Sequence, residues 1–218
     1  MQFVINPYDE FGLTKALQLK ESQGGTVTVV TYGDASVEAT LRKALAIGAD
    51  DAVRLDGVPT DALQVASELA TYADGQGYDL IICGQESIDY NGGIVPGALA
   101  AKLDVPFVNA CIGLEISGSN ATLLREMDGG KEELTATLPM VIGGKKGLVE
   151  ESELRIPNMR GIMTARTKPL AVTALAGAAA TTSALSFAKP APKAAVQLID
   201  ASNLDELVRR LHEEAKVI

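Results

Sequence analysis

Aromatic and basic side chains are scarce in this sequence, and their scarcity narrows the classes of protein to which it can belong. Aromatic residues make up 4% of the 218 residues, tryptophan is absent, and 19 lysines and arginines face 28 aspartates and glutamates. A nucleic-acid-binding surface needs a cationic stripe for the phosphates or an aromatic platform for the bases. The net charge of −9 and the low aromatic content therefore argue against a nucleic acid as partner.

Histidine and cysteine, which build many catalytic and metal sites, are also scarce. The single histidine, His212, lies beside Glu213 and Glu214 near the carboxyl terminus. A Ser-His-Asp triad or a histidine-based zinc site therefore cannot be assembled from this chain. Cys83 and Cys111 lie in apolar stretches with no CxxC spacing, which indicates buried free thiols in a reducing compartment. We predict no catalytic residue and no metal site, and we expect a cytoplasmic protein of a bacterium.

Long hydrophobic runs are missing as well. No apolar stretch has the length of a membrane-spanning helix, and no signal-peptide pattern opens the chain. We therefore expect a protein that is not embedded in a membrane. The length suits one α/β domain with an extension, or two small domains.

Short apolar runs alternate with helical segments through residue 103. The predicted strands are 26–32, 51–55 and 80–83, and the predicted helices are 7–20, 36–47, 61–73 and 98–103. Strands that alternate with helices of this length indicate right-handed βαβ crossovers. We predict the α/β fold class, with a Rossmann-like parallel sheet flanked by helices.

The pattern changes after residue 104. Strand-like segments separated by glycine turns cover 107–116, 121–125 and 132–137, and they predict an antiparallel β meander. A further buried strand is predicted at 138–142, a flexible basic turn at 143–147, and an irregular segment at 155–168. Residues 171–193 are rich in alanine, threonine and proline, which predicts an extended linker before an amphipathic helix that starts near residue 204. We predict a nucleotide-binding domain at 1–170 and a linker and C-terminal helix arm at 171–218.

The loop that follows the predicted strand at 80–83 contains four glycines, two amides and acidic residues before the next helix begins. Glycine lets backbone N–H groups approach a phosphate, and a helix amino terminus attracts anions. An ordinary strand-to-helix turn is the alternative, because the loop matches neither the P-loop pattern nor GxGxxG. Asp89 either caps this turn with its own side chain or binds a ribose hydroxyl or metal-bound phosphate.

Several separated segments resemble the β subunit of electron transfer flavoprotein. They are Asn-Pro-Tyr-Asp-Glu at 6–10, Ala-Leu-Ala-Ile-Gly-Ala-Asp at 44–50, the glycine loop at 84–97, Arg-Glu-Met-Asp-Gly-Gly at 125–130, Leu-Pro at 138–139, Gly-Ile-Met-Thr-Ala-Arg at 161–166 and the closing helix at 204–218. The segments follow one another in the same order as in that family and extend over nearly the whole chain.

The resemblance implies an electron carrier rather than an enzyme. Members of this family pair with an α subunit, and the heterodimer holds one FAD, mainly through α, and one AMP in β. Electrons arrive from acyl-CoA dehydrogenases of fatty acid oxidation or other flavin dehydrogenases and leave towards a membrane quinone oxidoreductase. In such a protein the cofactor supplies the redox chemistry, and the protein supplies binding and docking.

The resemblance also assigns residues to two sites. The implied AMP site comprises Asn6, Pro7, Tyr8, Asp9, Tyr32, Gly84, Gln85, Glu86, Ser87, Ile88, Asp89, Tyr90, Asn91, Gly92, Gly93, Ile94 and Val95. The implied surface for docking dehydrogenases comprises Arg155, Ile156, Pro157, Asn158, Met159, Arg160, Gly161, Ile162 and Met163. Met159 stands where the family has an apolar anchor; the alternative is that it fills a gap in the core.

The sequence departs from the family in three places. Family members begin with a further strand that lies centrally in the sheet, and without it we expect the chain to fold poorly alone. The residues from Tyr90 to Ile94 differ from the usual ones, which leaves the nucleotide open. The basic cluster after the docking segment is reduced to Arg166 and Lys168. Two alternatives follow: an electron-bifurcating subunit with a second FAD in place of AMP, and a stand-alone nucleotide sensor.

Overall fold

The computed structural model describes residues 3–193 and 195–218. They form two compact units, one that ends at Ser183 and one that starts at Ala184. The helices of the first unit are α1 (Pro7–Gln23), α2 (Glu38–Ile47), α3 (Ala62–Ala73), α4 (Val95–Leu103) and α5 (Met159–Ala165), with short 3₁₀ turns η1 (Ala35–Val37) and η2 (Glu151–Glu153). Its strands are β1 (Thr28–Gly33), β2 (Asp51–Asp56), β3 (Leu80–Gly84), β4 (Phe107–Ser117), β5 (Asn120–Met127), β6 (Gly130–Thr137), β7 (Met140–Gly144) and β8 (Leu170–Ala174). The second unit contains α6 (Leu204–Arg209) and the π-helical turn η3 (Arg210–Ala215).

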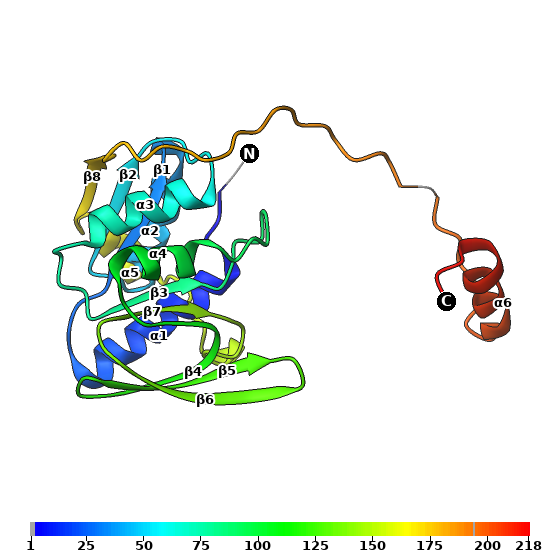
Figure 1. Ribbon diagram of the computed structural model, residues 1–218, viewed down its shortest axis with the longest axis horizontal. Coiled ribbons are helices and arrows are strands. Elements are labelled where there is room, and N and C mark those ends of the chain that lie inside the picture. The colour runs from blue at the N-terminus through cyan, green and yellow to red at the C-terminus, as the bar shows by residue number, and fades with distance from the viewer. Residues whose placement is uncertain (1–2, 194) are drawn as a thin grey trace. The chain divides into compact units, whose positions relative to one another are not determined.

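The strands form two sheets, and the predicted α/β class is confirmed. One sheet has the order β1-β2-β8 and is parallel throughout. The other has the order β3-β7-β4-β5-β6, in which β3, β7 and β4 are parallel and β4, β5 and β6 form the predicted antiparallel meander. Among the described residues, β1 and β3 are therefore each paired along one edge only. Figure 1 shows the three-stranded sheet at one end of the first unit and the β5–β6 hairpin at the other.

Helices cover the parallel strands and bury their apolar side chains. Phe11 of α1 packs with Val108 of β4 and with Met140 and Ile142 of β7 in the largest core cluster. On another side of the unit, α3 and α4 pack against each other (Figure 1), with their alanines and Leu99 covering Val141. Because β3 and β7 are held between these helices, the loops at their carboxyl ends have fixed positions.

Glycines end α1 and α2, and a small polar residue begins α3, close to the positions that the sequence predicts. Gly24 follows α1 with φ 85°, and Gly48 follows α2 with φ 151°, a conformation that glycine adopts without a Cβ clash. Asp61 caps α3 by accepting a hydrogen bond from the backbone N–H of Gln64 at 2.7 Å. These local signals explain why the first three helices lie within a few residues of their predicted bounds.

The structure differs from the sequence predictions in three segments after residue 142. The predicted flexible turn at 143–147 begins with Gly143 and Gly144, which are instead buried at the end of β7. The irregular segment contains the helix α5, which begins at Met159 because the side chain of Asn158, the residue before it, accepts from the N–H of Gly161 at 2.7 Å. Residues 170–174, at the start of the predicted arm, form β8 beside β2. The compact unit therefore extends past the predicted boundary at residue 170.

The helices of the described residues are short or carry charged residues. None of them combines the length and the apolar character that a bilayer crossing requires.

Candidate functional site

The amino terminus of α1 meets the glycine loop at the carboxyl end of β3, although the two segments lie about 80 residues apart in the sequence. Asn6 Nδ2 donates to Asp9 Oδ2 at 2.7 Å and to the carbonyl oxygen of Glu86 at 2.9 Å, while Asn6 Oδ1 accepts from the N–H of Ile88 at 3.3 Å. Asp9 Oδ1 accepts from the N–H of Gly84 at 2.6 Å. We expected Asn6 to cap α1 with its side chain, but that side chain is committed to the loop instead.

Asp9 has a perturbed acidity because it lies in this contact. Burial raises the pKa of Asp9 above its ordinary value, and the hydrogen bonds from Asn6 and Gly84 oppose that shift. Both carboxylate oxygens are used by neighbouring groups of the chain. Asn6 and Asp9 therefore hold the loop in position, rather than presenting free polar atoms to a ligand.

Gly84 is required at the end of β3 by steric contact. A Cβ at this position would lie 2.8 Å from Asn6 Nδ2, 2.8 Å from Tyr8 Cβ and 3.0 Å from Asp9 Oδ2. Real Cβ atoms do not approach other heavy atoms this closely, so only glycine lets α1 sit against the strand end. The glycine that the sequence places at the start of the loop thus serves helix packing.

The middle of the loop is a tight, exposed turn. The N–H of Asn91 donates to the carbonyl oxygen of Ser87 at 2.8 Å, and Asn91 has φ 50°. Ser87 Oγ donates to Asp89 Oδ2 at 3.2 Å and accepts from the N–H of Asp89 at 3.4 Å. Asp89 therefore has the local turn contacts that one of its two predicted roles requires. Tyr90 at the tip is 84% exposed.

Unused backbone N–H groups lie between this turn and α4. Within the described part of the chain, the amides of Gly92, Gly93 and Ile94 donate to no acceptor. They lead into the first turn of α4, where helix geometry leaves the N–H groups without intrahelical partners. A Cβ on Gly92 would meet no atom within 4 Å, so the space beside the backbone is open there. This arrangement can bind an anionic group such as a phosphate.

Tyr32 lies in a different environment from the other predicted nucleotide ligands. It is 8% exposed and packs with Val53 and Leu55 in the three-stranded sheet. Its hydroxyl donates to the carbonyl oxygen of Val58 at 3.4 Å, and burial raises the pKa of Tyr32, with a smaller contribution from Glu68. The structure thus brings together Asn6, Tyr8, Asp9 and the glycine loop, and it gives Tyr32 a core role.

Two further residues near the loop were not singled out from the sequence. Lys145 follows β7, and its pKa is raised by the hydrogen-bonded Glu126 carboxylate, with smaller contributions from Tyr8 and Glu86. Asn109 of β4 lies against Gly143, and its Oδ1 is buried without a hydrogen-bond partner among the described residues. The two consecutive lysines after Gly144 could have indicated Lys145 in the sequence. No sequence pattern pointed to Asn109.

The predicted docking segment is exposed and partly helical. Arg155 forms a bidentate ion pair with Glu21, at 2.6 Å and 2.5 Å, which ties the start of the segment to α1. Beyond it, Ile156 is 84% exposed, Met159 76% and Met163 67%, and the two methionines lie four residues apart on one face of α5. We call these three exposed apolar side chains the apolar ridge. The alternative in which Met159 fills a core gap does not fit this exposure.

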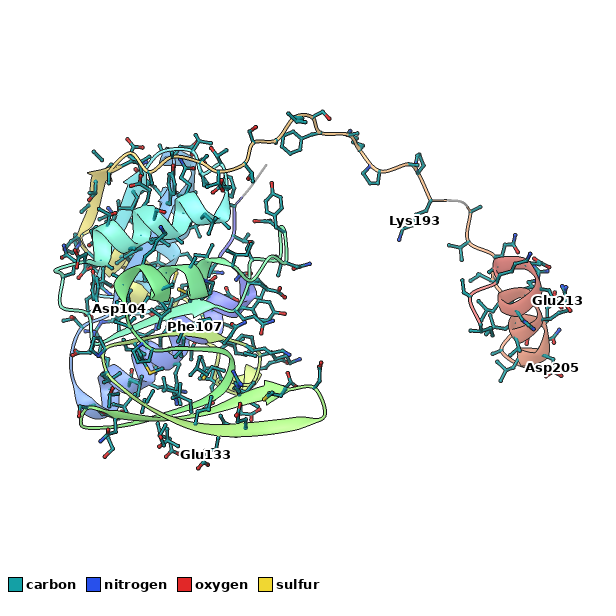
Figure 2. All side chains as sticks on the ribbon, in the orientation of Figure 1. Asp104, Phe107, Glu133, Lys193, Asp205 and Glu213 are labelled. Atoms are coloured by element: carbon teal, nitrogen blue, oxygen red, sulfur yellow. The ribbon has the colours of Figure 1, made fainter. Side chains whose placement is uncertain are left out.

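The second unit also presents apolar side chains to solvent. Leu204 is 62% exposed and Val208 54%, on one face of α6. Figure 2 shows the acidic side chains of Asp205 and Glu213 projecting from the same helical segment. An amphipathic helix of this kind needs a partner surface to bury its apolar face.

Comparison with known proteins relates the chain to electron-transfer proteins. The family model described as "Electron transfer flavoprotein domain" matches residues 2–178. The "Electron transfer flavoprotein subunit beta" of Bacillus subtilis (strain 168) is 40% identical over 173 residues, which cover 78% of this chain and 66% of the relative. The protein of the same name from Syntrophomonas wolfei is 36% identical over 197 residues, covering 89% and 77%.

A relative with a different name matches over a shorter region. "Protein FixA" of Azotobacter vinelandii is 34% identical over 157 residues, which cover 67% of this chain and 56% of that protein. The chain thus spans about two thirds of the length of the curated relatives it matches. On the extent of the family match, which covers both the glycine loop and the predicted docking segment, this chain belongs to the electron transfer flavoprotein domain family and is similar to its β subunits.

Proposed function

We propose that the chain is the β subunit of an electron transfer flavoprotein, and that it pairs with an α subunit, binds AMP in the glycine loop and forms one wall of the FAD site. The run of unused amides from Gly92 to Ile94, open to solvent and followed by the amino terminus of α4, is the observation that carries the proposal. The family match supports the electron-transfer role.

The residues near the loop fit a nucleotide phosphate through backbone groups. Lys145 is already paired with Glu126, so the loop offers amide dipoles rather than a free side-chain cation. Asn6 and Asp9 keep these amides in place by holding the opposite end of the loop. FAD supplies the electron-accepting chemistry when bound, and the residues of this chain bind, orient and shield it.

The apolar ridge of Ile156, Met159 and Met163 is the proposed contact for a flavin dehydrogenase. Methionine adapts its shape to different surfaces, which suits a carrier that accepts several partners. Among the described residues, neither Arg160 nor Arg166 forms an ion pair with a carboxylate. Arg160 lies between the two methionines in sequence and Arg166 follows them, and these two cations suit a partner with an acidic rim. Onward transfer to a quinone oxidoreductase completes the proposed role.

The second unit supports a protein partner. An α subunit would bury the apolar side chains of this unit that are more than half exposed. These side chains are Leu185, Phe187, Val196, Leu198, Leu204 and Val208. A stand-alone sensor would have no use for such a surface.

The cofactor content of the complex tests this proposal. The chain would be co-expressed with the α-like subunit of the same organism, and nucleotides released by denaturation would be quantified per heterodimer. One FAD and one AMP are expected. Two FAD and no AMP would replace the plain carrier by an electron-bifurcating subunit. Tight AMP binding by this chain with no heterodimer formed would favour the stand-alone sensor.

The docking surface is tested by Met159→Glu. A charge on the ridge should raise the KM for a reduced acyl-CoA dehydrogenase about tenfold or more, because desolvating a carboxylate in an apolar contact is unfavourable. The FAD content should not change. Loss of FAD together with activity would assign Met159 to the folded core and contradict the docking role.

A further inference from the structure

The docking helix α5 is seated on the carboxyl end of α2 by contacts that involve both helix termini. The last carbonyl groups of any α-helix lack intrahelical partners and need donors from elsewhere. Here a cation on α2 and a cation in the segment just after α5 each donate to carbonyl groups at the end of the other helix. Figure 1 shows α5 beside α2.

Lys168, just after α5, satisfies the end of α2. Its Nζ donates to the carbonyl oxygen of Leu45 at 3.0 Å and to that of Ala49 at 2.5 Å. Gly48 and Ala49 use the carbonyl oxygen of Ala44, so these bonds reach positions that the backbone cap leaves open. A cation at this end also interacts favourably with the helix dipole.

Arg42, on α2, satisfies the end of α5 in return. Its Nη1 donates to the carbonyl oxygen of Ala165 at 2.7 Å and to that of Lys168 at 2.8 Å. Ala165 itself is 3% exposed and packs with Leu41 and Leu45 of α2. The hydrogen bonds of Arg42 and Lys168 therefore surround a small apolar contact. Together they anchor the carboxyl end of a helix only seven residues long.

Gly161 allows the two backbones to touch. A Cβ on Gly161 would lie 2.3 Å from the carbonyl oxygen of Ala46, which belongs to the last turn of α2. Any other residue would force α5 away from α2, because the obstructing atom is backbone and cannot rotate aside. On the opposite side of the segment, Met159 and Met163 remain exposed.

We infer that Gly161, Lys168 and Arg42 are positioning residues for the docking surface: they hold α5 in one orientation on α2, so that the methionine ridge is preformed before a dehydrogenase binds. The inference rests on the proposed docking function. A short helix without such a seat is marginal in water, and a flexible ridge would lose conformational entropy on binding. The preformed ridge avoids that loss.

The test compares Gly161→Ala and Lys168→Met with matched controls in the heterodimer. Thr164→Ala is the control on α5, because its exposed hydroxyl bonds only within the helix, to the carbonyl oxygen of Gly161 at 3.1 Å. Lys131→Met, at an exposed position near the start of β6, is the control for lysine removal. Lys168→Met keeps the experiment decisive if Gly161→Ala does not fold. The readouts are amide hydrogen exchange across α5, and KM and kcat for an acyl-CoA dehydrogenase reduced by its acyl-CoA.

We expect at least tenfold faster exchange at the amides of Ile162 and Met163 in both variants, with KM raised severalfold, kcat and FAD content unchanged, and no effect in the controls. Unchanged hydrogen exchange at these amides would show that Gly161 and Lys168 do not hold α5 on α2. Faster exchange with unchanged KM, in a protein where Met159→Glu does raise KM, would overturn the positioning role. If Met159→Glu is silent as well, the docking surface itself is wrong, and the inference falls with it.

Discussion

At the scale of single residues, the packing of α1 on the glycine loop depends on close contacts. Neither an added methyl group nor the loss of a hydrogen-bond acceptor can be accommodated there. Gly84 has no room for a methyl group, and Asp9 has no oxygen without a donor. Both residues serve the packing of α1 on the glycine loop. Changes at these positions should therefore affect nucleotide binding through the position of the loop, without removing a group that touches the nucleotide.

Gly84→Ala should destabilise the first unit by about 1–3 kcal/mol, the usual cost of overpacking a well-filled site. The new methyl group would meet Tyr8 Cβ and Asn6 Nδ2 at 2.8 Å. Gly92→Ala is the matched control, since no atom lies within 4 Å of its would-be Cβ. Urea unfolding of the two variants measures the difference. Equal stabilities would mean that α1 is not packed against Gly84 as described.

Asp9 and Asp61 should change the free energy of unfolding with pH in opposite directions. Because burial raises the pKa of Asp9 above 3.8, its folded form binds the proton more tightly, and the free energy of unfolding should fall as pH rises from about 3.8 through the raised value. Hydrogen bonds from Gln64, Thr182 and Thr181 hold the pKa of Asp61 below its usual range, so its contribution is present above about 3.8 and is lost as pH falls.

Unfolding curves of Asp9→Asn and Asp61→Asn across this range test both signs. Asn at position 9 cannot titrate, so the stability of Asp9→Asn relative to the natural protein should increase with pH. The stability of Asp61→Asn relative to the natural protein should decrease with pH. If the free energies of unfolding of Asp9→Asn and the natural protein changed in parallel with pH, Asp9 would not be buried in the folded protein.

At the scale of secondary-structure elements, α3 fixes the chain where it leaves β8. Glu68 is 2% exposed, and its carboxylate accepts three backbone N–H groups, from Ala176 at 2.7 Å, Gly177 at 2.9 Å and Ala178 at 2.5 Å. Asp61, at the start of α3, accepts from the N–H of Thr182 at 2.7 Å. These contacts explain why the compact unit extends to Ser183 although the sequence from residue 171 has the composition of a linker.

Glu68→Ala should release the segment 176–182. Three amides would lose their acceptor, and each donor left unsatisfied costs about 1–3 kcal/mol where water cannot replace the bond. Limited proteolysis should then cut within this segment, and it should leave the segment intact in the natural protein under the same conditions. Ser67→Ala is the control, because its exposed hydroxyl bonds only the carbonyl oxygen of Leu63. Equal cleavage in both variants would contradict the anchoring role of Glu68.

At the scale of the whole molecule, the two units have different requirements for stability. The first contains the sheets and the four core clusters. The second contains the helical segment of α6 and η3, where surface ion pairs join Arg209 and Arg210 to Glu206. Surface pairs of this kind contribute about 0–1 kcal/mol each. The ion pairs by themselves therefore stabilise the second unit only weakly, which fits the proposed burial of its apolar side chains against an α subunit.

Leu207→Glu should weaken α-subunit binding at least tenfold and leave the unfolding of the first unit unchanged. The side chain is 38% exposed on the apolar face of α6, where a charge would have to be desolvated on binding. Glu213→Gln, at a side chain that projects outward in Figure 2, is the control. Calorimetric titration of the α subunit gives the affinity. Unchanged affinity for Leu207→Glu would exclude α6 from the interface.

The sequence by itself determined the local structure and the family. β-branched runs, helix caps and glycine stops depend on neighbours a few residues away, so strands β1 to β3, helices α1 to α3 and the meander could be predicted from them. The composition of the glycine loop singled out that part of the candidate site, and the other site residues were predicted from the family resemblance. What these signals missed was α5 and β8, because a short helix and a short strand are stabilised by packing on α2 and β2 rather than by their own composition.

Only the tertiary structure decided what each site residue does. It committed Asn6 and Asp9 to the loop across about 80 residues of sequence, placed Tyr32 in a core, brought Lys145 near Tyr8 and Glu86, and seated α5 on α2. These outcomes depend on which distant groups meet at the end of a parallel strand or helix. No local pattern encodes such a meeting, because a free carbonyl group or a missing Cβ matters only once another segment has packed against it.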